Sequence, residues 1–83
     1  MPEELNVPRI DVEATIHAAR DSEDLLRKLV SEGEHSEEIH NIIKRNTDHL
    51  SIILSKEEIQ ASNSPRLVGF QEAVDLGVAF ISE

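Results

Sequence analysis

The sequence contains a pair of side chains at a spacing that metal-binding helices use. Glu37 and His40 form a Glu-x-x-His unit, which places a carboxylate and an imidazole one turn apart on the same side of a helix. In di-iron carboxylate bundles, two such units bind metal together with further carboxylates. A dimer of this chain would supply the second unit, with Glu13 or Glu23 as a further carboxylate. One interpretation is therefore a metal-binding helical protein that uses Glu37 and His40 across a dimer.

The position of this pair on its helix argues against that site. If Ile39 and Ile43 face the core, His40 lies roughly 100° away and Glu37 lies further round, toward solvent. His35 and His40 are five residues apart and do not share a helix face, and the His-Glu-x-x-His zinc motif is absent. The sequence also has no Cys, no glycine-rich phosphate loop and no nucleophile elbow. We therefore expect no metal, no cofactor and no enzymatic activity.

The composition limits the class of partner. Among its 83 residues the chain has 17 acidic and 8 basic side chains, for a net charge of -9. A nucleic-acid binder needs a basic surface, so we expect no nucleic acid and favour a basic protein as a partner. An inhibitor that mimics the charge of DNA is a further alternative, although the acids are concentrated in the first half of the chain.

The location is predicted from segments that the sequence lacks. No apolar run approaches the roughly 20 residues of a transmembrane helix. The first residues do not have the pattern of a signal peptide. Together with the absence of Cys, which fits a reducing compartment, these features predict an intracellular protein without a membrane contact.

The elements that must position these side chains are predicted to be helices. Residues 1–8 form an irregular arm, because Pro2 and Pro8 remove backbone donors. Residues 9–83 form a single helical domain. We predict an all-α fold, a three- or four-helix bundle, completed by oligomerisation because so short a chain builds a small core.

The first helix is expected over residues 11–32. Asp11 is a suitable N-cap, and Gly33 follows the last apolar residues where a helix-ending glycine would lie. Apolar residues also alternate over residues 10–16, which leaves a strand as the alternative for that segment.

The second helix is expected after Ser36, which is a suitable N-cap. Its end is open, because Ser55 and Glu58 form a capping-box pattern. The helix either ends at Leu54 or continues through Gln60. Its apolar seam has heptad spacing of 4, 3, 4 and 3 and comprises Ile39, Ile43, Asn46, Leu50 and Ile53.

The last helix is expected to begin after Ser64 and to end near Ile81. Its apolar residues cover more than half of its circumference, which exceeds the stripe of an ordinary surface helix. Either this helix is central in the fold, or its second flank meets another chain. Gly77 lies within the apolar stripe, where a glycine indicates a close helix crossing.

We predict a homodimer or higher oligomer that associates through the second and last helices. Asn46 interrupts the apolar seam, and one polar seam residue often fixes register or oligomeric state. The alternative for Asn46 is a hydrogen bond within its own chain. The residues predicted at the subunit contact are Asn46, Leu50, Ile53, Leu76 and Phe80.

A stretch in the second half of the chain resembles phage proteins. From Asn46 to Lys56 it reads Asn-x-x-His-Leu-x-Ile-x-Leu-x-Lys, and an apolar segment from Ala73 to Ile81 follows. Residues 46–81 resemble the C-terminal half of small uncharacterised helical proteins encoded by bacteriophages and prophages. The resemblance implies a setting among accessory or structural phage genes, and it implies no activity. We therefore expect a small acidic structural or protein-interaction protein.

Overall fold

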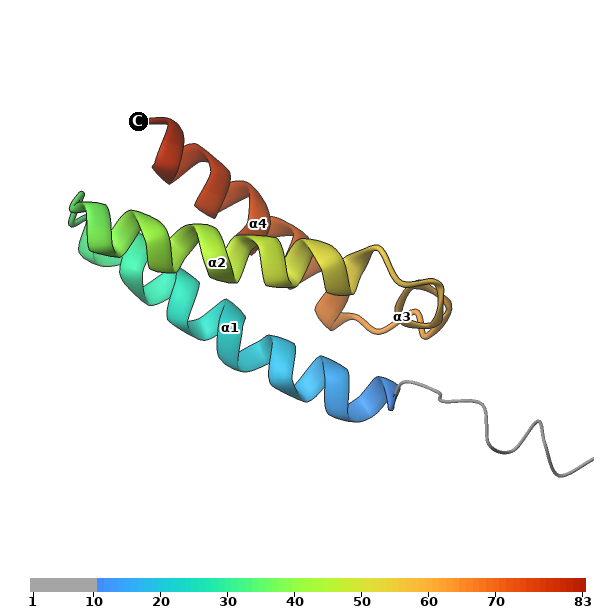
Figure 1. Cartoon of the computed structure of the whole chain (residues 1–83). Coiled ribbons are helices and arrows are strands. Elements are labelled where there is room, and N and C mark those ends of the chain that lie inside the picture. The colour runs from blue at the N-terminus through green and yellow to red at the C-terminus, as the bar shows by residue number, and fades with distance from the viewer. Residues whose placement is uncertain (1–10) are drawn as a thin grey trace, which may run out of the picture.

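The structure, a computed structural model, describes residues 11–83 and forms four helices and no strand within that range (Figure 1). The helices are α1 (Val12–Glu32), α2 (Glu37–Leu54), α3 (Glu57–Ala61) and α4 (Arg66–Ser82). The three long helices pack against one another, and the short α3 contacts α1 and α2. The all-α prediction is confirmed, whereas the predicted arm over residues 1–8 lies outside the described residues.

Caps define both ends of α1. The Asp11 side chain accepts a hydrogen bond from the Ala14 backbone N–H at 3.1 Å. Gly33 follows the helix with a φ of 75°, in the left-handed region that glycine adopts without strain. Its N–H donates to the Leu29 carbonyl at 3.2 Å. Residues 12–16 are therefore helical, and the strand alternative for that segment is wrong.

Removing the α1 N-cap is expected to lower the free energy of unfolding by about 1 kcal/mol. In Asp11→Ala the Ala14 N–H loses its acceptor, so one terminal donor of the helix depends on water. Urea unfolding followed by circular dichroism measures the loss. Asp24→Ala is the matched control, because Asp24 is an exposed acid within the same helix. Equal losses in the two variants would contradict the capping role.

The break after α2 settles the alternative that the sequence left open. The helix ends at Leu54, and Ser55 is its C-cap. The Ser55 hydroxyl donates to the Ile52 carbonyl at 2.6 Å, so it terminates α2 and does not begin α3. The Gln60 side-chain amide donates to the Leu54 carbonyl at 2.7 Å, which satisfies an acceptor at the helix end.

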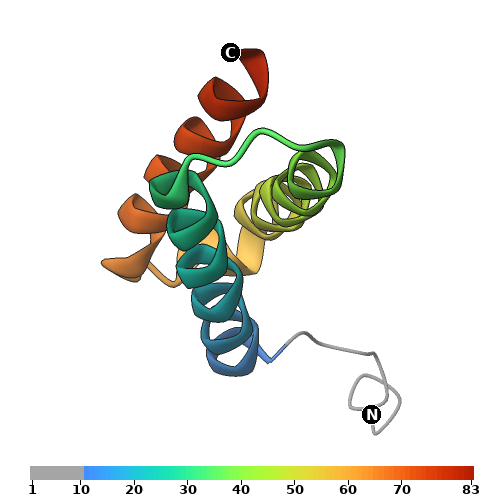
Figure 2. The same cartoon turned by 90° about the vertical axis from the view of Figure 1, so that its left-hand side faces the viewer.

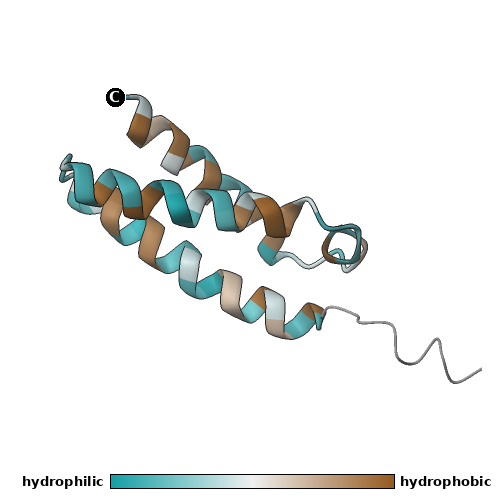
Figure 3. Cartoon of the chain, in the orientation of Figure 1, coloured by the Kyte–Doolittle hydropathy of each residue, from teal (hydrophilic) through white to brown (hydrophobic). Residues whose placement is uncertain are grey.

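The core lies where α1, α2 and α4 meet. Figure 3 shows hydrophilic and hydrophobic segments alternating along α1 and α2, as amphipathic helices require. Phe70 is the largest fully buried side chain. The buried apolar residues are Ala19, Leu26, Ile43, Leu50, Ile53, Ile59, Phe70, Ala73 and Phe80.

None of the helices within residues 11–83 has the length and apolar character needed to cross a bilayer.

Helices α2 and α4 approach closely at Thr47 and Gly77. A Cβ atom on Gly77 would overlap the Thr47 hydroxyl and would lie 3.4 Å from Leu26 Cδ1. The predicted close crossing at Gly77 is therefore confirmed. Thr47 is buried, and within residues 11–83 its hydroxyl finds no hydrogen-bond partner. The polar residue that α2 buries is thus Thr47. It follows directly after Asn46, the polar residue predicted in the apolar seam.

Arg27 links α1 to α4. Its Nε atom donates to Glu23 Oε2 at 3.0 Å, four residues earlier in the same helix. Its Nη2 atom donates to the Gly69 carbonyl at 3.1 Å and lies 3.5 Å from Glu72 Oε1. One guanidinium therefore joins a carboxylate of α1 to both backbone and side chain of α4.

Candidate functional site

The residues predicted at a subunit contact differ in how far their own chain covers them. Leu50, Ile53 and Phe80 are buried by the helices of the same chain. Leu76 remains 39% exposed on α4. Asn46 is half-buried. A contact between copies remains a prediction, and Leu76 is the large apolar side chain of this set that is open to a partner.

Asn46 forms a hydrogen bond within its own helix. Its side-chain amide donates to the Ile42 carbonyl, one turn earlier, at 2.9 Å. This bond uses a donor of the amide without a second copy of the chain. A role for Asn46 in setting the arrangement of an oligomer therefore remains a prediction.

Five large apolar side chains stay exposed in the described part of the chain, and three of them are on α4. At about 100° per residue, Val68 and Leu76 lie within an arc of about 80° that also holds Glu72 and Ala79. We call these four residues the outer face of α4. It carries both apolar and acidic side chains. The exposed apolar residues are Leu25, Ile52, Val68, Leu76 and Val78.

Two histidines meet beside the C-terminal end of α4. His35 lies in the loop between α1 and α2, which passes α4 in Figure 2. Its Nδ1 atom is 2.8 Å from Nε2 of His40, and its Nε2 atom is 3.0 Å from Oε1 of Glu83. The His35 ring stacks on Phe80, with 4.0 Å between centroids and 7° between planes. We call these four residues the histidine cluster.

The local sequence explains how the histidine cluster forms. Gly33 ends α1 and Ser36 caps α2, with its hydroxyl accepting from the Ile39 N–H at 3.1 Å. The connection between the two caps is so short that His35 must lie beside the first turns of α2. His35 and His40 share no helix face, as the spacing predicts, yet they meet because His35 lies in the loop before α2. The close spacing of the two caps was the signal that could have indicated it.

The predicted pair Glu37 and His40 is not joined by any hydrogen bond or ion pair among the described residues. Glu37 is exposed at the start of α2, whereas His40 is half-buried and contacts His35 and Phe80. Residues 11–83 contain no group of three or more His, Cys, Asp or Glu side chains placed to hold a metal ion. The Glu37–His40 site across a dimer remains a prediction.

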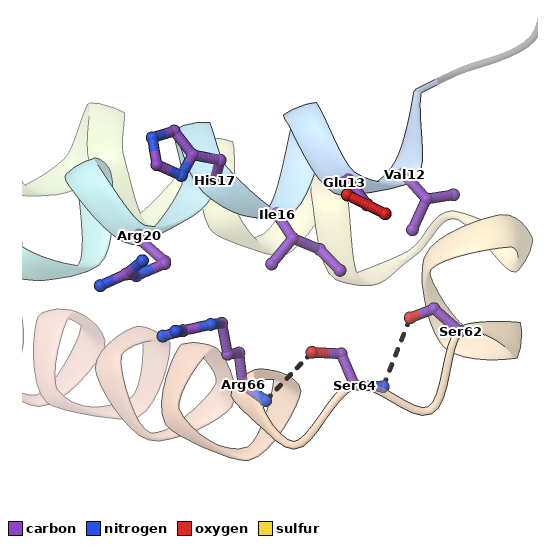
Figure 4. A pocket seen from close by; sticks show the side chains of 8 residues that line it. All are labelled: Val12, Glu13, Ile16, His17, Arg20, Ser62, Ser64 and Arg66. Carbon is purple, nitrogen blue, oxygen red and sulfur yellow. Dashed lines mark hydrogen bonds between the residues drawn. The ribbon is translucent and has the colours of Figure 1, made fainter.

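A shallow groove of about 350 Å³ lies between the first half of α1 and the segment leading into α4 (Figure 4). Figure 4 shows the side chains of Arg20 and Arg66 extending in the same direction. The Ser64 hydroxyl accepts from the Arg66 N–H at 3.2 Å, so it serves to begin α4. The two guanidinium groups would attract a small anionic group to the groove. The carboxylate of Glu13, which also lines the groove, would repel such a group. Its lining is Val12, Glu13, Ile16, His17, Arg20, Ser62, Ser64 and Arg66.

The comparisons with known proteins give no relative from which a site could be transferred. No family model, no curated protein and no solved structure matches this chain.

Proposed function

We propose that this chain is a small acidic protein-interaction protein that acts as a homo-oligomer through the outer face of α4. One observation carries the proposal. Helix α4 is the most apolar of the three long helices and packs against both α1 and α2, yet it leaves Val68 and Leu76 exposed. Burying apolar surface stabilises an assembly by about 25 cal/mol per Å². In a chain with so small a core, burial at a subunit contact adds a large share of the total stability.

Charge and exposed apolar residues favour the outer surface of α2 on another copy as the occupant. Arg45 and Ile52 are exposed on α2 and are seven residues apart, so they lie on one side of the helix. In such a contact Arg45 would meet Glu72, and Ile52 would meet the exposed Val68 or Leu76. Pairing α4 with α4 would instead bring the Glu72 side chains of both copies together, and each of them has only the partly exposed Arg27 of its own chain to offset the repulsion. The proposed contact therefore joins α4 of one copy to α2 of the next.

A charge introduced on either proposed face is expected to abolish self-association. Val68→Glu, Leu76→Glu and Ile52→Glu each replace an apolar contact by a group that needs hydration. Sedimentation velocity over a range of concentrations measures the loss. Because all three positions are exposed, the variants are expected to keep the helical circular dichroism of the parent chain.

Gln71→Glu is the matched control, because Gln71 is exposed on α4 outside its outer face and the substitution adds the same charge. It is expected to associate like the parent chain. If Gln71→Glu weakens association as much as Val68→Glu, net repulsion and not the proposed apolar contact governs the assembly. A complex that forms only with an added basic protein, and that both α4 substitutions leave intact, would contradict self-association. It would support the basic protein partner that the net charge favours.

A further inference from the structure

We infer that His35 and His40 chelate a divalent transition-metal ion of the Zn²⁺ class, held between His35 Nδ1 and His40 Nε2. Both ligands belong to one chain, so this inference goes beyond the proposed self-association and does not depend on it. Imidazole nitrogen is a common ligand for Zn²⁺, Ni²⁺ and Cu²⁺. The site differs from the predicted Glu37–His40 pair, because its second ligand comes from the loop before α2.

The distance between the two nitrogens is close to that of a chelate. They lie 2.8 Å apart. With Zn–N bonds of about 2.0–2.1 Å and tetrahedral angles, two imidazole nitrogens on one zinc lie about 3.3 Å apart. Binding therefore requires an opening of roughly half an ångström, and the two facing lone pairs must turn toward a common point beside the line that joins the nitrogens.

Glu83 prepares His35 for this role. Its carboxylate lies 3.0 Å from Nε2, and a carboxylate accepts a hydrogen bond, so the proton of neutral His35 is placed on Nε2. The lone pair of Nδ1 then points toward His40. A carboxylate that accepts from the outer N–H of a histidine is the usual support of a metal-binding imidazole. Phe80, stacked on the ring at 4.0 Å, fixes its plane.

The proton balance of binding requires no other reactant. Before binding, Nε2 of His40 donates to Nδ1 of His35. On binding, the proton of His40 moves to its own Nδ1 through solvent, and both facing lone pairs bind the ion. The remaining coordination positions belong to water, since the described residues offer no third protein ligand at this point. We therefore expect an exchangeable ion and not a structural zinc site of the kind that four protein ligands form.

Titration calorimetry with Zn²⁺ tests the site. The parent chain should bind one ion per chain, and Mg²⁺, which prefers oxygen ligands, should give no comparable heat. His35→Phe keeps an aromatic ring against Phe80 but removes the nitrogen, so it should lose binding while retaining its helical circular dichroism. Glu83→Gln should weaken binding by about tenfold.

The double variant His17→Gln/His49→Gln is the matched control, because it removes the two other histidines of the chain. It should bind Zn²⁺ like the parent chain. Imidazole ¹⁵N spectra of this variant contain two rings only and should show His35 bound through Nδ1 and His40 through Nε2. Absence of binding to the parent chain, binding that survives His35→Phe, loss of binding in the double variant, or half an ion per chain would each overturn the inference.

Discussion

Replacing Phe70 by alanine is expected to lower the free energy of unfolding by about 3–5 kcal/mol. Phe70 is fully buried on α4 and belongs to the core that α1, α2 and α4 share. Its removal leaves a cavity that the surrounding helices cannot fill completely. Native domains have a total stability of about 5–15 kcal/mol, and short chains lie at the lower end. We therefore expect Phe70→Ala to be largely unfolded at room temperature, as measured by circular dichroism and urea titration.

Val78→Ala provides the comparison for this loss. Val78 lies on the same helix, outside its outer face, and is 53% exposed. Its truncation should change the free energy of unfolding by less than about 0.5 kcal/mol. A Phe70→Ala variant that unfolds at the same urea concentration and with the same cooperativity as Val78→Ala would show that α4 does not pack as described.

Gly77→Ala is expected to be destabilising, although alanine is a better helix former than glycine by about 1 kcal/mol. The added Cβ would overlap the hydroxyl of Thr47 and would lie 3.3 Å from its Cβ. Overpacking of this kind typically costs about 1–3 kcal/mol. The contact joins two helices, so relief would require α2 and α4 to move apart. Urea unfolding should therefore show a net loss, where helix propensity alone predicts a gain.

A second substitution at the crossing separates the overlap from other effects. Thr47→Ala removes the hydroxyl that faces Gly77, so it should restore most of the stability that Gly77→Ala loses. The double-mutant cycle measures this coupling directly. Gly69→Ala is the control on the same helix, because its Cβ would meet the movable end of the Glu23 side chain. Independent effects of the Thr47 and Gly77 substitutions would contradict the close crossing.

The helix ends could be predicted because their determinants are local. Asp11, Gly33 and Ser36 each form the cap that residue type and position indicate. Where two local signals competed, the sequence left alternatives. The Ser55 hydroxyl could begin one helix or end the previous one, and only its bond to the Ile52 carbonyl decides between them.

The side chain at the covered face of α2 could not be predicted from its heptad spacing. A heptad seam describes a helix that meets one partner, whereas α2 packs against both α1 and α4. The covered face is broader, and it includes Thr47 because Gly77 on α4 makes room for it. Asn46 lies at the edge of this face and is half-buried.

The histidine cluster depends on contacts between distant parts of the chain. His35 and Glu83 are separated by 48 residues, and no spacing rule joins them. The sequence predicts Phe80 at a subunit contact, which remains a prediction. Phe80 is buried by its own chain, with His35 stacked on its ring. Long-range packing therefore determines which apolar residues of α4 stay open.

Sedimentation equilibrium of the parent chain tests the proposed self-association most directly. The monomer has a mass of 9.3 kDa. We expect the weight-average mass to exceed this value in the micromolar range, to rise with concentration, and to fall back to the monomer value in Leu76→Glu. A mass of 9.3 kDa at every concentration up to the solubility limit would contradict the proposal and would leave α4 as a helix that serves only its own fold.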